Sequence, residues 1–224
     1  FEGMLAWDDA VDGPRPGVLV AHTIRGRSQF EESKAVALAA QGYTGFAVDV
    51  YGKEAIGSDI EACREMMEAL RSERAVLQQR LLRALQAMRG QPEVDATSVA
   101  AIGYCFGGLC ALDIARTGEP LAGVVSFHGL FDPPGNTADN RIAARVLALH
   151  GWDDPLATPE QAVAFGEELS SMGADWQLHC YGNVRHAFTN PAADASTGVT
   201  IYNEAADRRS WAAAQYFLSE LFDT

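Results

Sequence analysis

The stretch VAAIGYCFGG, residues 99–108, carries the strongest fold signal in the chain. Its first half is an apolar run typical of a buried strand, and its second half is a turn in which Cys105 stands between Gly103 and Gly107. This G-x-nucleophile-x-G pattern, placed between a strand and a helix, is typical of a nucleophile elbow. Side chains at the two glycines would clash in so tight a turn, and the N-terminus of the next helix favours a thiolate. The sequence therefore predicts a sharp turn that presents the Cys105 sulfur.

The same turn has two other interpretations. Free cysteines are often buried structural residues, and a glycine-rich turn before a helix can hold a phosphate. However, the stretch lacks a Lys-Ser/Thr pair and a complete G-x-G-x-x-G motif. The nucleophile interpretation is preferred for that reason.

Outward from this stretch, short apolar runs alternate with helical segments, which predicts a mostly parallel sheet with helices on both faces. We assign residues 1–224 to one α/β domain, without internal repeats, and residues 132–140 to a surface loop. Predicted strands cover residues 17–22, 44–50, 99–104, 122–127, 145–150 and 176–181; predicted helices cover 31–41, with Gly42 as its C-cap, 60–89 as one or two helices, 106–116, 159–172 and 203–221.

Composition narrows the function classes. The 224 residues are 48% hydrophobic and carry a formal net charge of −13, which disfavours binding to nucleic acid or anionic membranes. The four cysteines form no CxxC pair or zinc-finger spacing, so we expect no metal and a reducing, cytoplasmic location. No membrane span or signal peptide is recognisable. The first residue is Phe1 rather than methionine, so the sequence leaves the true start open.

An acid and a histidine follow two later strands. Asp153 and Asp154 lie just after the 145–150 strand, where either can orient a base, although Asp-Asp-Pro is also good turn chemistry. His186 follows the 176–181 strand and is one of five histidines, so a structural role is the common alternative. In parallel sheets, functional residues gather beyond the carboxyl ends of the strands, and nucleophile, acid, histidine is the chain order of α/β-hydrolase triads.

The oxyanion of such a mechanism needs backbone N–H donors. One donor is expected from Phe106, directly after the nucleophile. The second is expected from the loop at residues 22–26, after the first predicted strand.

These residues resemble the dienelactone hydrolase family. The resemblance rests on GYCFGG at 103–108, on AQGY to DVYG between 40 and 52, on HG followed by DP between 150 and 155, and on HAF at 186–188. It implies an α/β-hydrolase fold with a cysteine nucleophile. It also selects Asp154 over Asp153 as the acid and assigns the second oxyanion donor to Ile24.

Two positions depart from the family pattern. Members that act on dienelactone carry a glutamate where this chain has Thr23, and a carboxylate-binding arginine near the position of Asn190. The sequence leaves open whether one of four arginines replaces it: Arg25, Arg71, Arg74 or Arg185.

The expected function is hydrolysis of a small-molecule lactone or carboxylic ester through Cys105, Asp154 and His186, with a thioester intermediate and no cofactor. We expect a monomer or homodimer. Two alternatives are a binding or regulatory protein with a silent triad and a thiol redox protein that uses Cys105, with Cys110 as a poorly placed partner. Tyr104, Phe106, His128 and Trp152 are candidates for a pocket lining or for ordinary core.

Overall fold

A single sheet organises the computed structural model, which describes residues 1–55 and 58–222. Within those residues the strand order is β1-β3-β2-β4-β5-β6-β7, with β1 antiparallel to β3 and every other neighbouring pair parallel. The strands are β1 (Met4–Ala6), β2 (Arg15–Ala21), β3 (Thr44–Ala47), β4 (Val94–Tyr104), β5 (Gly123–Phe127), β6 (Arg145–Gly151) and β7 (Trp176–Tyr181). The predicted α/β class with a mostly parallel sheet is confirmed.

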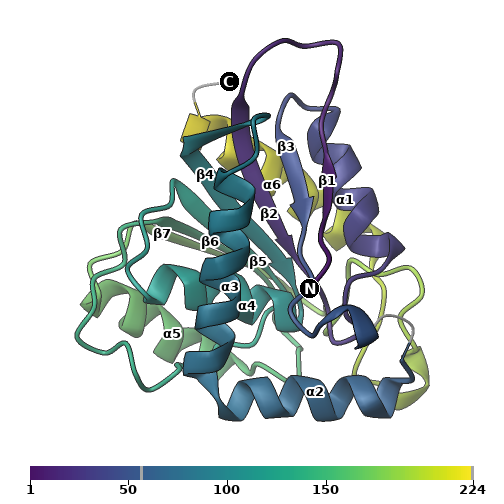
Figure 1. Ribbon diagram of the computed structural model, residues 1–224. Helices are drawn as coiled ribbons and strands as arrows, with labels where there is room; N and C mark the ends of the chain where they lie inside the picture. The colour runs from purple at the N-terminus through teal and green to yellow at the C-terminus, as the bar shows by residue number, and fades with distance from the viewer. Residues whose placement is uncertain (56–57, 223–224) are drawn as a thin grey trace.

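Helices cover both faces of this sheet (Figure 1). They are α1 (Gln29–Ala39), α2 (Ile60–Ser72), α3 (Arg74–Arg89), α4 (Phe106–Arg116), α5 (Pro159–Ser171) and α6 (Glu204–Phe222), with short 3-10 turns η1 (Lys53–Ala55) and η2 (Ala195–Thr197). The segment 60–89 forms two helices because the backbone leaves helical geometry at Glu73. The cap of α1 is Ala40, and Gly42, the predicted cap, lies two residues later with φ +90°.

Alternation along the strands creates two cores. In β4, Ala100 and Ile102 pack with α1 and α6, whereas Val99 and Ala101 pack with α3, α4 and α5. Side chains of a strand point alternately to opposite faces, so an uninterrupted apolar run places a core on each side. The central strands of the sheet are thereby buried on both faces.

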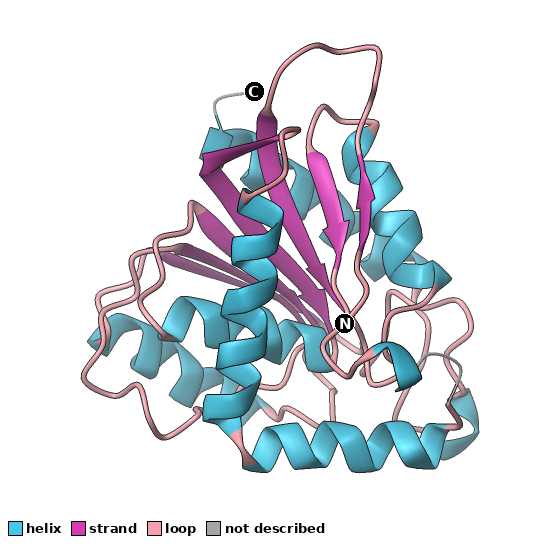
Figure 2. Cartoon of the chain, in the orientation of Figure 1, coloured by secondary structure: helices cyan, strands magenta, loops and turns pink. Residues whose placement is uncertain are grey.

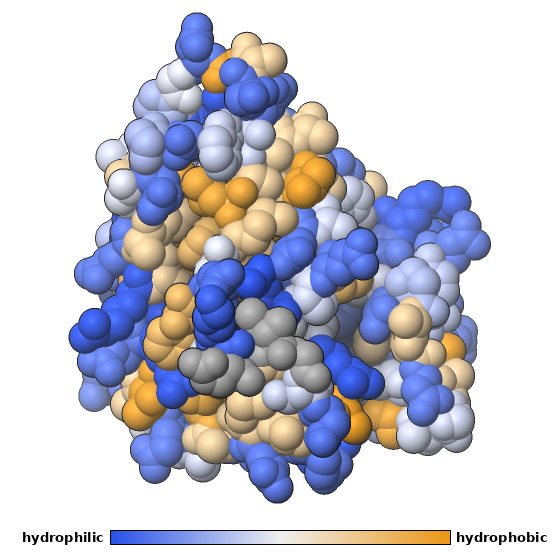
Figure 3. All heavy atoms as spheres, turned by 45° about the vertical axis from the view of Figure 1, so that its right-hand side comes forward, coloured by the Kyte–Doolittle hydropathy of each residue, from blue (hydrophilic) through white to orange (hydrophobic). Residues whose placement is uncertain are grey.

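The edge strand β1 is shorter than the central strands of the sheet. Strand β1 has only three residues, MLA, and no alternating pattern long enough to predict a strand; its pairing with β3 is set by tertiary contact. Figure 3 shows the side of the molecule to the right in Figure 1, where apolar surface lies among polar groups. Trp7, just after β1, is 42% exposed. A short edge strand offers little template for pairing with another chain.

The carboxyl ends of the parallel strands gather at one end of the molecule. Figure 2 shows the strand arrows converging there, and α2 runs across that end (Figure 1). The Cys63 thiol of α2 contacts the carbonyl oxygen of Arg25 at 3.7 Å, which ties α2 to the loop after β2. The residues after β2, β4, β6 and β7 therefore meet in one place.

Candidate active site

Cys105 occupies a strained turn between β4 and α4. Its backbone has φ 56° and ψ −116°, a conformation that L-residues rarely adopt, and its side chain is half-buried. A Cβ atom at Gly103 would lie 1.9 Å from the carbonyl oxygen of Gly107, and one at Gly107 would lie 2.1 Å from that of Ala21. Both obstacles are backbone atoms, which cannot give way. The turn therefore requires glycine on both sides of Cys105.

Asp154 and His186 meet beside this turn. Nδ1 of His186 lies 2.7 Å from Oδ2 of Asp154, and both side chains are almost fully buried. The other carboxyl oxygen of Asp154 accepts a hydrogen bond from the Leu156 N–H at 2.8 Å. Asp153, in contrast, is exposed. Of the two aspartates that the sequence left open, the structure brings Asp154 to the histidine.

Cys105 and His186 perturb each other. Burial by itself would raise the pKa of the Cys105 thiol, but interaction with His186 and with the N–H groups of Phe106 and Ile24 lowers it below its ordinary value. Burial likewise opposes charge on His186, yet the Cys105 and Asp154 side chains raise its pKa to about 10. Nε2 of His186 is buried without a hydrogen bond of standard geometry. Opposite shifts of this kind favour a thiolate–imidazolium pair.

Ile24 and Phe106 lie on the two backbone segments that face the sulfur, since their N–H groups both act on Cys105. Tyr51 connects the two segments: its hydroxyl donates to the Ile24 carbonyl at 3.1 Å, and its ring stacks on that of Phe106 with centroids 5.8 Å apart. Two backbone donors directed at one point can stabilise negative charge there. This linkage through Tyr51 had no sequence signal.

Three of the other four histidines are buried and have other partners. His22 and His150 are buried and bonded to backbone groups, and burial lowers the pKa of each. His128 was considered only as a pocket residue; its ring packs edge-on against His186, with centroids 5.1 Å apart, and its Nε2 lies 2.8 Å from the Thr189 hydroxyl. Burial, and then the charge of His186, holds the pKa of His128 well below its ordinary range. It is therefore a neutral neighbour of the central histidine.

Most of the four candidate arginines already have partners. Arg71 pairs with Asp132, Arg74 is buried against Asp113, and Arg185 donates to the Gly198 carbonyl. Within residues 1–55 and 58–222, the guanidinium of Arg25 has no hydrogen bond or ion pair. Arg25 directly follows Ile24 in the chain and is exposed.

Thr23 and Asn190, the two departures from the family pattern, support local turns. Thr23 donates its N–H to Glu31 and accepts from the Arg25 N–H, and Asn190 accepts from the Ala192 N–H. Neither side chain supplies the carboxylate or the guanidinium that the family pattern has at these two positions.

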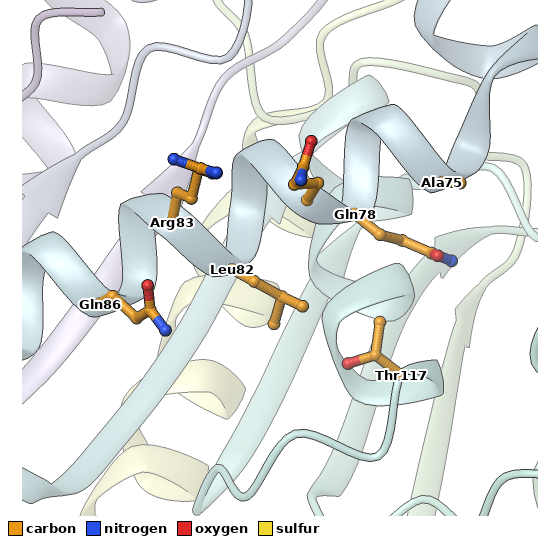
Figure 4. Close-up of a pocket in the computed structure, with 7 residues that line it drawn as sticks. Ala75, Gln78, Leu82, Arg83, Gln86 and Thr117 are labelled. Carbon is orange, nitrogen blue, oxygen red and sulfur yellow. The ribbon is translucent and has the colours of Figure 1, made fainter.

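Two surface hollows among the described residues are lined by side chains other than Cys105. One lies between α3 and the end of α4 (Figure 4), and the other lies beside α5 and β7, with Trp152 in its lining. Of the pocket candidates, Tyr104 and Phe106 are fully buried core residues and His128 is 1% exposed, whereas Trp152 is 43% exposed. The cluster of groups with shifted pKa values around Cys105, His186 and His128 marks the candidate site. The first hollow is lined by Ala75, Gln78, Gln79, Leu82, Arg83, Gln86 and Thr117.

No helix within residues 1–55 and 58–222 has the length and apolar character needed to cross a membrane. No group of three or more histidine, cysteine, aspartate or glutamate side chains there is arranged to hold a metal ion.

Known proteins resemble this chain over most of its length. The model of the dienelactone hydrolase family matches residues 1–222. An uncharacterized protein of Caenorhabditis elegans is 36% identical over 65% of this chain and 94% of its own length. A Bradyrhizobium protein named probable 2-oxo-3-(5-oxofuran-2-ylidene)propanoate lactonase is 26% identical over 83% of this chain and 78% of its own. A solved structure, described as a dienelactone hydrolase-like promiscuous phosphotriesterase from metagenomic libraries, is 39% identical with a TM-score of 0.92, covering 98% of this chain and 92% of that one.

Proposed function

Because the chain belongs to the dienelactone hydrolase family and is a carboxylic ester or lactone hydrolase, we propose that Cys105, His186 and Asp154 are its catalytic triad. The observation that carries the proposal is the 2.7 Å contact of His186 with Asp154, together with the lowered pKa of Cys105 and the raised pKa of His186. A nucleophile, a base and an orienting acid are what acyl transfer through a covalent intermediate requires.

The first half of the proposed reaction forms a thioester. The Cys105 thiolate attacks the carbonyl carbon, and the carbonyl electrons move to the oxygen, which the N–H groups of Phe106 and Ile24 stabilise. The tetrahedral intermediate then collapses, and the bond to the leaving oxygen breaks. The imidazolium of His186 gives its proton to that oxygen, so a lactone ring opens while its acyl carbon stays on Cys105.

The second half releases the acid. His186, now neutral, takes a proton from water as the water oxygen attacks the thioester carbon. The resulting intermediate expels the Cys105 thiolate and leaves the carboxylic acid, which restores the starting charges. Asp154 holds the imidazole in the required tautomer throughout.

Arg25 is proposed to bind an anionic group of the substrate. Its guanidinium is unpaired within the described residues and lies one residue from the Ile24 donor. A planar guanidinium suits a carboxylate because it can form two parallel hydrogen bonds. This assignment favours small anionic lactones or esters as substrates. The four free cysteines support a reducing location for the enzyme, the cytoplasm.

The test compares wild type, Cys105→Ala and His186→Ala on p-nitrophenyl acetate and a panel of small lactones in reducing buffer. Cys180→Ala is the matched control, because Cys180 is an exposed thiol away from the triad. Both triad variants should lose about 10⁴-fold or more in kcat while remaining folded, and the control should match wild type. Full turnover in Cys105→Ala would refute the proposed nucleophile. No turnover by wild type, with Cys105 also unreactive to iodoacetamide, would favour the silent binding protein instead.

A second substrate class has support from one relative. The solved structure that is 39% identical to this chain is described as a promiscuous phosphotriesterase. Donors that stabilise a carbonyl oxyanion can also bind a phosphoryl oxygen. Release of p-nitrophenol from paraoxon by wild type but not by Cys105→Ala would support this activity, and equal release by both would exclude it.

A further inference from the structure

Glu31 is a fully buried carboxyl group that the triad does not use. It lies in the first turn of α1, and its oxygens accept three hydrogen bonds: from the Ser28 N–H at 3.0 Å, the Ser28 hydroxyl at 2.7 Å and the Thr23 N–H at 3.1 Å. The bond from the Ser28 N–H is one half of an ordinary capping box, whose other half is the Glu31 N–H donating to the Ser28 hydroxyl. The contact with Thr23 lies outside that motif and reaches eight residues back along the chain. One carboxyl group therefore ties both ends of the segment 23–28.

This segment carries Ile24, whose N–H acts on the Cys105 sulfur. The peptide group between Thr23 and Ile24 supplies that N–H. On its N-terminal side, Glu31 holds the Thr23 N–H; on its C-terminal side, the Tyr51 hydroxyl holds the Ile24 carbonyl. The donor peptide is thus restrained from both directions.

A loop that makes its own turn would still need such restraint. The segment closes on itself with a bond from the Gly26 N–H to the Thr23 carbonyl at 3.3 Å, which fixes its shape but not its orientation toward α4. Glu31 contributes to this orientation from α1, which packs on the sheet, beside the contacts of the Cys63 thiol with the Arg25 carbonyl and of the His22 ring with the Thr23 carbonyl. A donor must be held within a few tenths of an ångström of its productive place to stabilise an oxyanion.

We propose that Glu31 is a positioning residue for the oxyanion hole, holding the Ile24 N–H on the sulfur and on the developing oxyanion by bonding Thr23 and Ser28. This inference rests on the proposed function, in which Cys105 is the nucleophile. It assigns a role to a residue of the helix cap that no motif of the triad contains.

A role of Glu31 through its charge and a role through positioning predict opposite shifts in the pKa of the Cys105 thiol when Glu31 is neutralised. If Glu31 acted through its negative charge alone, neutralising it would make a nearby thiolate easier to form and would lower the pKa of Cys105. If it positions the Ile24 donor, the same change would weaken a hydrogen bond to the thiolate and raise that pKa. The direction of the shift therefore separates the two roles, and a loss of stability alone would cause neither.

The experiment uses Glu31→Gln, with Glu32→Gln as the matched control. Glu32 lies in the same helical turn but pairs with Arg27 at the surface side, so its change removes equal charge without touching Thr23. The rate of Cys105 alkylation by iodoacetamide, followed by mass spectrometry across pH, reports the thiol pKa. Turnover of p-nitrophenyl acetate gives kcat and KM.

We expect Glu31→Gln to raise the thiol pKa and to lower kcat by about 10- to 100-fold with KM nearly unchanged, because an amide nitrogen of glutamine would face an N–H donor. Glu32→Gln should match wild type in both measurements. Ser28→Ala keeps both backbone bonds of Glu31, so it should lower the melting temperature without shifting the thiol pKa. If Glu31→Gln does not fold, Glu31→Asp, which keeps the charge but shortens the side chain, should show the same upward shift.

A folded Glu31→Gln enzyme with an unchanged or lowered thiol pKa, or with wild-type kcat, would overturn the inference. An equal upward shift in Glu32→Gln would do the same, because that variant leaves the bonds of Glu31 to Thr23 and Ser28 in place. Failure of the proposed function looks different: Cys105→Ala would then keep its turnover.

Discussion

The two ends of α4 hold buried charged groups in different ways. At the N-terminal end, Cys105 faces His186, and each partner can give or take a proton. At the C-terminal end, Asp113 is fully buried and accepts two hydrogen bonds from Arg74, at 2.6 and 2.7 Å, and lies 3.4 Å from Arg116. Arginine does not lose its proton under ordinary conditions.

The comparison separates chemistry from anchoring. Asp154 and Asp113 are both buried, but Asp154 pairs with a histidine whereas Asp113 pairs with arginines. A carboxylate with a titratable partner can tune proton transfer, whereas one between permanent cations can only hold structure. The network of Arg116 extends to Glu168 of α5 and to the Phe131 carbonyl, so it fixes α4 behind the elbow.

The largest expected effect is at the titratable end. Asp154→Asn should lower kcat by roughly 10³- to 10⁴-fold, because an amide nitrogen opposite Nδ1 favours the tautomer in which Nε2 already carries the proton. Steady-state kinetics measure this. Asp153→Asn is the control, since Asp153 is exposed, and it should be unchanged. Equal losses in both variants would contradict the assignment of Asp154.

The next effect is on stability at the anchoring end. Asp113→Asn should lower the free energy of unfolding by about 3–5 kcal/mol, because buried Arg74 loses its carboxylate and Arg116 keeps only that of Glu168. Urea denaturation measures this, and kcat at 25 °C should stay close to wild type. If Asp113→Asn were as stable as wild type but inactive, the C-terminal end of α4 would take part in the chemistry, and the distinction between the two ends of α4 would be wrong.

The pH profile sharpens the comparison. The lowered pKa of Cys105 makes the thiolate available below the pH at which an ordinary thiol ionises, so kcat/KM should rise early with pH. The raised pKa of His186 keeps its proton available for the leaving group until pH passes about 10, above which lactone hydrolysis should fall. Asp154→Asn should narrow the pH range between the rise and the fall of kcat/KM, whereas Asp113→Asn should leave both the rise and the fall at the same pH. With a p-nitrophenyl ester, whose leaving group needs no proton, kcat/KM should not fall at high pH.

The smallest effect concerns binding. Arg25→Gln should raise KM for anionic lactones by about 5- to 10-fold through loss of one charged contact, and should leave p-nitrophenyl acetate unaffected. Increasing salt should reduce the difference in KM for anionic lactones between wild type and Arg25→Gln. An equal change for neutral and anionic substrates would remove Arg25 from the proposed binding role.

Much of the fold followed from local patterns, and the misses have physical causes. Strands with continuous apolar runs, such as residues 99–104 within β4, were predicted because burial on both faces requires such runs. Strand β1 was not, because three residues carry no periodicity and its pairing with Thr44–Ala47 is a long-range contact. The boundary between α2 and α3 was left open because no glycine or proline marks Glu73.

The candidate site divides in the same way. The residues of the sequence nominated Cys105 and His186 by chemistry and by their place after strands, and left Asp153 and Asp154 open. The tertiary structure decided which aspartate meets His186, that Arg74 is committed to Asp113, and that His128 packs on His186. It also decided the roles proposed for Tyr51 and Glu31, whose contacts join segments distant in the chain.

What the sequence by itself determined was therefore the mostly parallel α/β sheet and the glycine-flanked turn at Cys105, because apolar periodicity and steric need for glycine are local properties. What only the tertiary structure decided was the direction of each pKa shift and the partner of each buried charge. Those depend on burial and on distances between side chains from separate strands, and no local pattern of residues encodes them.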